Sequence, residues 1–273
     1  MTTHTVTTPG NPVVRQRLPV GAAITHVGTL TKRSLLKIKA DPEELLGFTV
    51  QPIMFVLLFV YVFGGALAGN TERYLQFALP GIIVQSVIFA TMGTGLGLNT
   101  DIGNGVFDRF RSLPISRWAP LAAQVFGDIV RYALSAVILL SVGVLLGFRI
   151  QTGFLSAVAA LGLMLVFAVA ICWVSCLVGL LVRTTQGVQM FAMTLMFPIT
   201  FASTVFVRAE SMPGWLQVFV ENNPVTHLAT AIRGLLLGGQ WEVVAPTVWT
   251  LLWAAGIVAV FAPLSVWAYL RRV

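Results

Sequence analysis

The sequence predicts an all-α, polytopic membrane protein with six transmembrane helices, and charge distribution and composition together carry that prediction. Residues 74–100, 150–182 and 243–270 contain no Asp, Glu, Lys or Arg, and each stretch exceeds the roughly 20 apolar residues that cross a bilayer. Of the 273 residues, 57% are hydrophobic and 10% are charged, whereas soluble domains have about 25% charged residues. A transmembrane β-barrel would show alternating segments of about 10 residues, so the continuous runs favour helices.

The N-terminal part is expected to contain a tail and a surface helix. Residues 1–21 include three prolines and no apolar run of the kind found in signal peptides, which predicts a disordered cytoplasmic tail. Residues 22–273 are expected to form one transmembrane domain. Within it, residues 22–40 place apolar and basic side chains on separate arcs, as an N-terminal amphipathic elbow helix in the membrane interface would. A solvated helix packed on a soluble partner is the alternative. The basic arc contains Lys32, Arg33, Lys37 and Lys39.

Helix-start signals and apolar runs then place the six spans. Asp41 suits an N-cap, Pro42 suits the first helical position, and Glu44 stands where a capping box places an acid. Pro52 is expected to kink the first span. The predicted spans are about residues 45–68, 76–98, 121–148, 154–181, 187–207 and 245–269.

The segment between spans five and six predicts a short extracellular re-entrant helical hairpin. Pro213 opens an apolar stretch, and Asn223-Pro224 suits an N-cap followed by the first residue of a second helix. Helices that dip into a membrane without crossing it are tolerated where they pack against protein. The alternative is a seventh span, which would place Arg271 and Arg272 outside.

The positive charges predict which way the chain is inserted. The formal net charge is +7, and 12 of the 17 Lys and Arg residues fall on one side of the six-span arrangement. Because cytoplasmic loops carry the excess of Lys and Arg, both termini are expected to be cytoplasmic. The cations lie in loops beside spans, so anionic lipid headgroups fit them better than nucleic acid does.

The sequence lacks the motifs that common types of catalytic site contain. Only three lysines occur and none follows a glycine, so a phosphate-binding loop is excluded. Three scattered histidines predict no metal site, and no serine lies in a G-x-S-x-G elbow. Cys172 and Cys176 lie inside an apolar run and are interpreted as core or lipid-facing thiols. The sequence therefore gives poor support to an enzyme that acts alone.

Four polar residues within spans are candidates for a translocation path or its entrance. Asp128 and Arg131 are three residues apart, so they are predicted either to form an intrahelical ion pair near the cytoplasmic boundary or to contact cargo there. Gln51 and Gln85 are predicted either to line a path or to hold helices together through hydrogen bonds. The spacing Gly93-x-x-x-Gly97, like that of residues 143 and 147, predicts close helix packing.

The polar segment 104–117 between spans two and three is the most distinctive one in the chain. It mixes aromatic and basic side chains and is too long for a tight turn, which favours a docking surface. A solvated cytoplasmic loop is the alternative. Its notable residues are Phe107, Arg109, Phe110, Arg111, Leu113 and Pro114.

With this segment included, the chain resembles the permeases of type 2 ABC exporters, in their daunorubicin-resistance-like branch. The resemblance covers about residues 22–270 and rests on four features in order. They are a basic segment with Arg33 before Asp41-Pro42, the loop ending at Arg117, the six-span layout, and the motifs at 212–217, 223–226 and 231–234.

The resemblance implies a permease subunit in a bacterial cytoplasmic membrane that exports amphipathic drugs, antibiotics or lipids. It implies a second permease copy, in a homodimer or heterodimer, and two cytoplasmic subunits that bind ATP and magnesium, so this chain itself needs no cofactor. It also implies that the elbow helix and the loop after span two couple to the ATPase. The implied coupling residues are Lys32, Arg33, Phe107, Arg109, Phe110, Arg111, Leu113 and Pro114.

Other functions remain open from the sequence. A polysaccharide or glycolipid export permease has the same architecture and differs in cargo. A membrane-embedded lipid-modifying enzyme would need a buried acid, base or nucleophile cluster. A non-catalytic scaffold or immunity protein would not stimulate an ATPase in response to a substrate.

Overall fold

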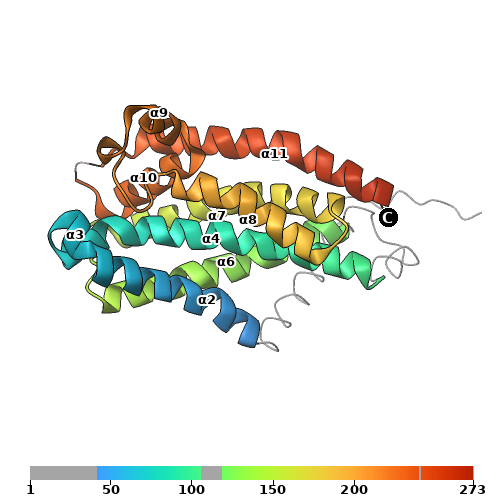
Figure 1. Cartoon of the computed structure of the whole chain (residues 1–273), viewed down its shortest axis with the longest axis horizontal. Coiled ribbons are helices and arrows are strands. Elements are labelled where there is room, and N and C mark those ends of the chain that lie inside the picture. Colours follow the sequence, from blue (N-terminus) through green and yellow to red (C-terminus); the bar gives the residue numbers. More distant parts are fainter. Residues whose placement is uncertain (1–41, 106–118, 240, 273) are drawn as a thin grey trace, which may run out of the picture.

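The structure is a computed structural model that describes residues 42–105, 119–239 and 241–272 (Figure 1). These residues form helices and connecting turns without a strand, which confirms the predicted all-α class for the described part. The elements are α2 (Pro42–Leu57), a π-helix η1 (Leu58–Phe63), α3 (Gly64–Ala68), α4 (Thr71–Gly103), α6 (Ala119–Leu145), α7 (Phe154–Leu181), α8 (Thr185–Phe201), a 3₁₀ turn η2 (Ala209–Ser211), α9 (Gly214–Asn222), α10 (Pro224–Leu237) and α11 (Val244–Arg272).

Four of the described helices, α4, α6, α7 and α11, are long and apolar enough to cross a membrane. The other two predicted spans correspond to shorter segments. One is the run α2–η1–α3, and the other is α8, which has 17 residues. The structure thus confirms four spans by length and composition, and six crossings remain a prediction. The predicted elbow helix, residues 22–40, lies outside the described residues.

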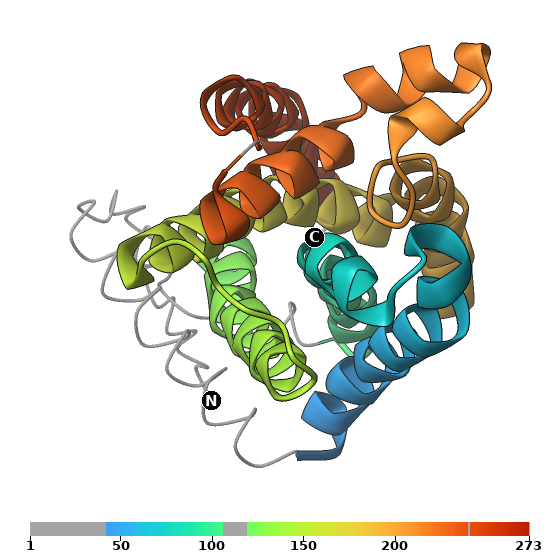
Figure 2. The same cartoon turned by 90° about the vertical axis from the view of Figure 1, so that its left-hand side faces the viewer.

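The long helices run side by side along the longest axis of the molecule (Figure 1). α3, α9 and α10 gather at one end, called here the hairpin end. α11 finishes at the opposite end, called here the Arg272 end. The view from the hairpin end shows α10 lying across the bundle and α9 projecting to its side (Figure 2). The two predicted short helices are therefore present, and their re-entrant position in a membrane stays a prediction.

α4 is the central helix of the bundle and α11 is a peripheral one (Figure 2). α4 packs against α2, α6, α7, α8 and α10, while α11 packs on α7 and α10. Within their most apolar windows, 72% of α4 but only 17% of α11 is buried. Because α11 is apolar yet uncovered, lipid is the medium that its outer face requires.

Glycines set the closest helix contacts, partly at positions that the sequence pattern missed. A Cβ atom on Gly143 would lie within 2.1 Å of the Leu79 side chain, so this member of the predicted 143/147 pair does permit close packing. Gly97 does not make the corresponding contact, since a Cβ atom there would meet only the Gln124 side chain, at 3.7 Å. Gly95, two residues earlier, approaches the backbone of α7 instead.

Candidate functional site

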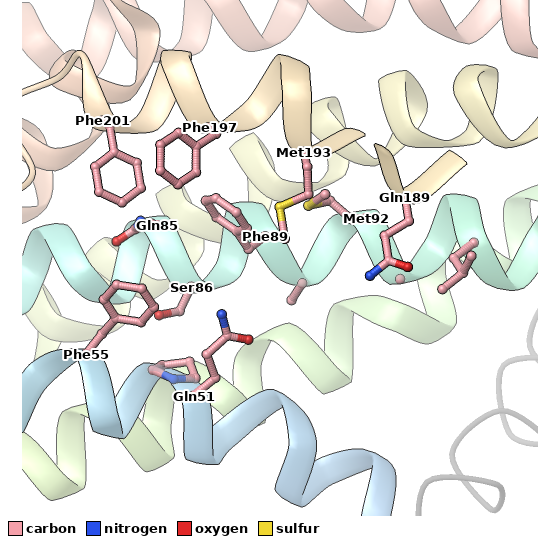
Figure 3. A pocket seen from close by; sticks show the side chains of 14 residues that line it. Gln51, Phe55, Gln85, Ser86, Phe89, Met92, Gln189, Met193, Phe197 and Phe201 are labelled. Atoms are coloured by element: carbon pink, nitrogen blue, oxygen red, sulfur yellow. The ribbon is translucent and has the colours of Figure 1, made fainter. Parts of the chain in front are cut away.

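A groove between α2 and α8, with α4 as its floor, combines apolar walls with polar groups (Figure 3). It measures about 300 Å³, which lies at the lower end of the range for small-molecule sites. Its lining residues recur at helical spacing, so each of the three helices turns one stripe toward it. From α2 these are Gln51, Pro52 and Phe55; from α4, Gln85, Ser86, Phe89, Ala90, Met92, Gly93 and Leu96; from α8, Gln189, Met193, Phe197 and Phe201.

The α2–α8 groove is aromatic and amide-rich, and none of the described residues that line it is acidic or basic. Phe197 and Phe201 stack with ring centroids 4.1 Å apart. The Gln85 side chain is only 6% exposed, and it makes no hydrogen bond to another described residue. Its amide group can therefore bond a hydroxyl or carbonyl group of a ligand in the groove.

The structure separates the four residues predicted for the path into two pairs. Gln51 and Gln85 both line the α2–α8 groove, together with Gln189. Asp128 and Arg131 lie on α6 and form a salt bridge, with 2.8 Å between Arg131 Nη2 and Asp128 Oδ1. Neither residue of this pair lines the groove, and both are buried.

The Asp128–Arg131 pair belongs to a buried polar cluster that joins three helices. The Thr94 hydroxyl on α4 donates to Asp128 Oδ2 and lies 2.6 Å from the Tyr132 hydroxyl. Tyr132 in turn lies 3.8 Å from Cys172 Sγ on α7. This arrangement favours the interpretation of the pair as an intrahelical ion pair, since both ionic groups make their contacts within the helix bundle.

Replacing Asp128 with Asn is expected to lower the unfolding free energy by about 2 kcal/mol. This is less than the about 3–5 kcal/mol for a fully uncompensated buried charge, because the amide oxygen still accepts hydrogen bonds. Transport per folded molecule should be unchanged. Unfolding in detergent and transport at matched protein amounts measure the two quantities, with the exposed Glu72→Gln variant on α4 as control. Normal stability with impaired transport would instead place the pair in the path.

The residues predicted to couple to an ATPase cannot be positioned. Lys32 and Arg33, and the whole segment 106–118 with Phe107, Arg109, Phe110, Arg111, Leu113 and Pro114, lie outside the described residues. Their role therefore stays a prediction.

Sequence reasoning did not single out Arg233, which it included within the motif at 231–234. Arg233 on α10 is fully buried and donates to the carbonyl oxygens of Phe77 (2.9 Å), Thr204 (2.6 Å) and Val205 (3.1 Å). Its guanidinium carbon lies 4.0 Å from the centre of the Phe77 ring. Burial lowers the pKa of Arg233 to about 9, so it still carries a proton at neutral pH. The sequence feature that could have identified Arg233 is a single cation inside an apolar stretch.

Asn223 connects α8 to α10, which confirms and extends its predicted role as an N-cap. Its side-chain oxygen accepts from the Val225 amide at 2.9 Å. Its amide group donates to the carbonyls of Ile199 and Ala202, both at 2.7 Å. These bonds terminate α8 at Phe201, so the prediction that the fifth span reaches residue 207 is wrong. The end of α8, and with it the hairpin-end wall of the groove, is fixed by a residue more than 20 positions away.

Comparisons with known proteins place the chain among transport proteins. The family model described as ABC-2 type transporter matches residues 25–237. The chain is 42% identical to the daunorubicin resistance ABC transporter permease protein DrrB1 of Streptomyces coeruleorubidus, over 93% of this chain and 87% of that protein. It is 29% identical to the probable doxorubicin resistance ABC transporter permease protein DrrC of Mycobacterium tuberculosis, over 86% and 85%. It is 28% identical to the putative transport permease ycf38 of Cyanophora paradoxa, over 80% and 76%.

The family match spans far more than half of the chain, and it includes α2, α4, α8 and the α10 helix that holds Arg233. The first of these relatives is similar over nearly the whole length of both proteins. The chain therefore belongs to the ABC-2 type transporter family.

Proposed function

We propose that this chain is the permease subunit of an ABC exporter that moves an amphipathic drug or antibiotic outward across the bacterial cytoplasmic membrane. The observation that carries the proposal is the α2–α8 groove. Its phenylalanines provide faces for a flat, aromatic molecule, while Gln51, Gln85 and Gln189 provide donors and acceptors for its polar substituents. The relatives named for daunorubicin and doxorubicin resistance support the same cargo class.

The groove would be completed by a second permease copy. α2 and α8, its two walls, expose large apolar side chains beside it, such as Met54 (58% exposed) and Met190 (71% exposed). In a dimer, two such faces would enclose a common path at the seam. The two walls are also the short helical segments, and we propose that they complete six crossings in this setting.

Transport would follow alternating access, with no chemical step in this chain. Two cytoplasmic subunits would bind ATP and magnesium and dock on the elbow helix, through Lys32 and Arg33, and on the loop 106–118. Their closure would reopen the seam toward the outside. The Lys and Arg bias favours cytoplasmic termini. With that orientation, the hairpin end with α9 and α10 would close the outer mouth of the path.

A tryptophan at position 86 tests the groove directly. Ser86 lines it and is half-buried on α4, and its hydroxyl donates to the carbonyl four residues earlier, Ile82. Ser86→Trp would fill the groove, and efflux of daunorubicin is expected to fall at least about tenfold, which corresponds to about 1.4 kcal/mol of barrier. The measurement is ATP-dependent accumulation of the fluorescent drug in inverted vesicles that contain the permease and its ATPase subunit.

Ser141→Trp on α6 is the matched control. Ser141 makes the same type of bond, to the Val137 carbonyl, but it is exposed and lies away from the groove. Its variant is expected to transport normally. Full transport by Ser86→Trp would reject the groove as the path. Failure of the unaltered chain to move either daunorubicin or doxorubicin would reject the cargo class.

A further inference from the structure

We propose that a pocket at the Arg272 end binds the phosphate of an anionic phospholipid headgroup. The pocket measures about 350 Å³. Four of its seven lining residues are Arg183, Trp267, Arg271 and Arg272, and the others are leucine and alanine side chains. We refer to it as the arginine pocket. Among the described residues no acidic side chain lines it, and three cations share one concave surface.

Arg272 has a structural role that explains its presence. Its Nη1 donates to the carbonyls of Gly179 (3.2 Å) and Val182 (3.0 Å), and to that of Leu180. Asn99 Nδ2 donates to two of the same carbonyls, at 2.9 Å and 2.8 Å. These bonds satisfy the carbonyls left free at the end of α7 and place a cation at the negative end of that helix.

Arg183 and Arg271 lack such an explanation within the described residues. Both are exposed, and neither donates a hydrogen bond or forms an ion pair with another described residue. The Arg271 guanidinium lies 4.0 Å from the centre of the Trp267 ring, which orients it beside the pocket. Guanidinium groups match the geometry of phosphate oxygens, so these two side chains are available to hold an anion.

The position of the arginine pocket favours a lipid over a free anion. It lies where α7 ends at Leu181 and α11 ends at Arg272, and both helices are long and apolar enough to cross a membrane. The pocket is therefore at headgroup depth. Tryptophan is enriched at this depth, and basic pockets between spans on the cytoplasmic side bind anionic headgroups. Leu181 (62% exposed) and Trp267 (50% exposed) offer apolar surface for the adjoining acyl chain.

This assignment does not depend on the cargo. It requires a membrane position for α7 and α11, and the proposed orientation adds only that the lipid belongs to the cytoplasmic leaflet. A failure of daunorubicin transport would leave it standing, and loss of lipid binding would leave the groove proposal standing.

The test compares lipid retention by purified chains in an equimolar mixture of phosphatidylglycerol and phosphatidylcholine. The unaltered chain is expected to retain phosphatidylglycerol selectively. The double variant Arg183→Gln/Arg271→Gln is expected to lower that selectivity about 30-fold, the loss corresponding to two cations near an anionic surface. Arg73→Gln/Arg149→Gln is the matched control, because both side chains are exposed at the hairpin end. It should retain the lipid, as should Arg183→Lys/Arg271→Lys, which keeps the charges.

Other outcomes would overturn the proposal. Equal selectivity in Arg183→Gln/Arg271→Gln, or equal loss in the hairpin-end control, would show that the pocket has no part in it. Displacement of phosphatidylglycerol by millimolar inorganic phosphate would identify a site for free anions. Loss of the copurifying ATPase subunit with unchanged lipid retention would identify a protein-docking surface. Thermal unfolding of each variant in zwitterionic detergent verifies the fold, and single variants replace the double one if it fails this test.

Discussion

Replacing Arg233 with alanine is expected to lower the unfolding free energy by at least about 3 kcal/mol, because three buried carbonyls would each lose a donor at about 1–3 kcal/mol. These carbonyls belong to Phe77 on α4 and to Thr204 and Val205 in the turn after α8. Arg233 itself lies on α10, so one side chain joins three segments. Its removal would loosen the hairpin end as a unit, and we expect poor recovery of folded protein.

Arg233→Lys should rescue only part of this loss. Lysine keeps the charge, but its single ammonium group cannot reproduce the planar fork that reaches both α4 and the 204–205 turn. The neighbouring Arg208→Gln is the control. Arg208 is exposed, and its guanidinium lies over the same Phe77 ring at 5.6 Å. Thermal and denaturant unfolding in detergent provide the measurement. Equal stability of Arg233→Ala and Arg208→Gln would contradict the assigned role.

The sequence predicted the α7 helix at residues 154–181, and the structure has Phe154–Leu181. The agreement has a local cause, since an uncharged apolar run begins after Gly153 and ends at Arg183. The short helices α9 and α10 were also predictable, because Pro213 and Asn223-Pro224 carry their start signals in their own sequence.

The end of α8 was not predictable in this way. Its apolar residues continue to Val207, but the helix stops at Phe201. The backbone groups beyond that point bind Asn223 and Arg233 instead. Such bonds join residues far apart in the chain, so a helical period in a window of sequence contains no information about them.

The candidate site was only half predictable for a related reason. Gln51 and Gln85 could be singled out as polar residues within apolar runs, and both line the groove. Their convergence with Gln189 and four phenylalanines depends on α2 and α8 flanking the same face of α4, which is a tertiary fact. Asp128 and Arg131 looked equally suitable in sequence. Their orientation toward Thr94 and Tyr132 places them elsewhere.

Adding a single methyl group at Gly95 is expected to be about as damaging as removing Arg233. A Cβ atom there would lie 2.3 Å from the Ser175 carbonyl oxygen on α7, and one on Gly179 would lie 2.3 Å from the Gly95 carbonyl oxygen. The backbones of α4 and α7 thus touch reciprocally. Neither carbonyl can move away without moving its helix. Gly95→Ala is therefore expected to cost about 3 kcal/mol, at the upper end of the range for overpacked sites.

Gly97→Ala, two positions further along α4 and on a different face of the helix, provides the sharpest comparison. Its Cβ would meet only the end of the Gln124 side chain, at 3.7 Å, so the higher helix propensity of alanine should make it neutral or stabilising by up to about 1 kcal/mol. Unfolding in detergent measures both variants. If Gly95→Ala unfolds like Gly97→Ala, the two helices are not in backbone contact. If it is destabilised as expected, daunorubicin efflux should fall as well, because α4 also carries Gln85 and Ser86 on the floor of the groove.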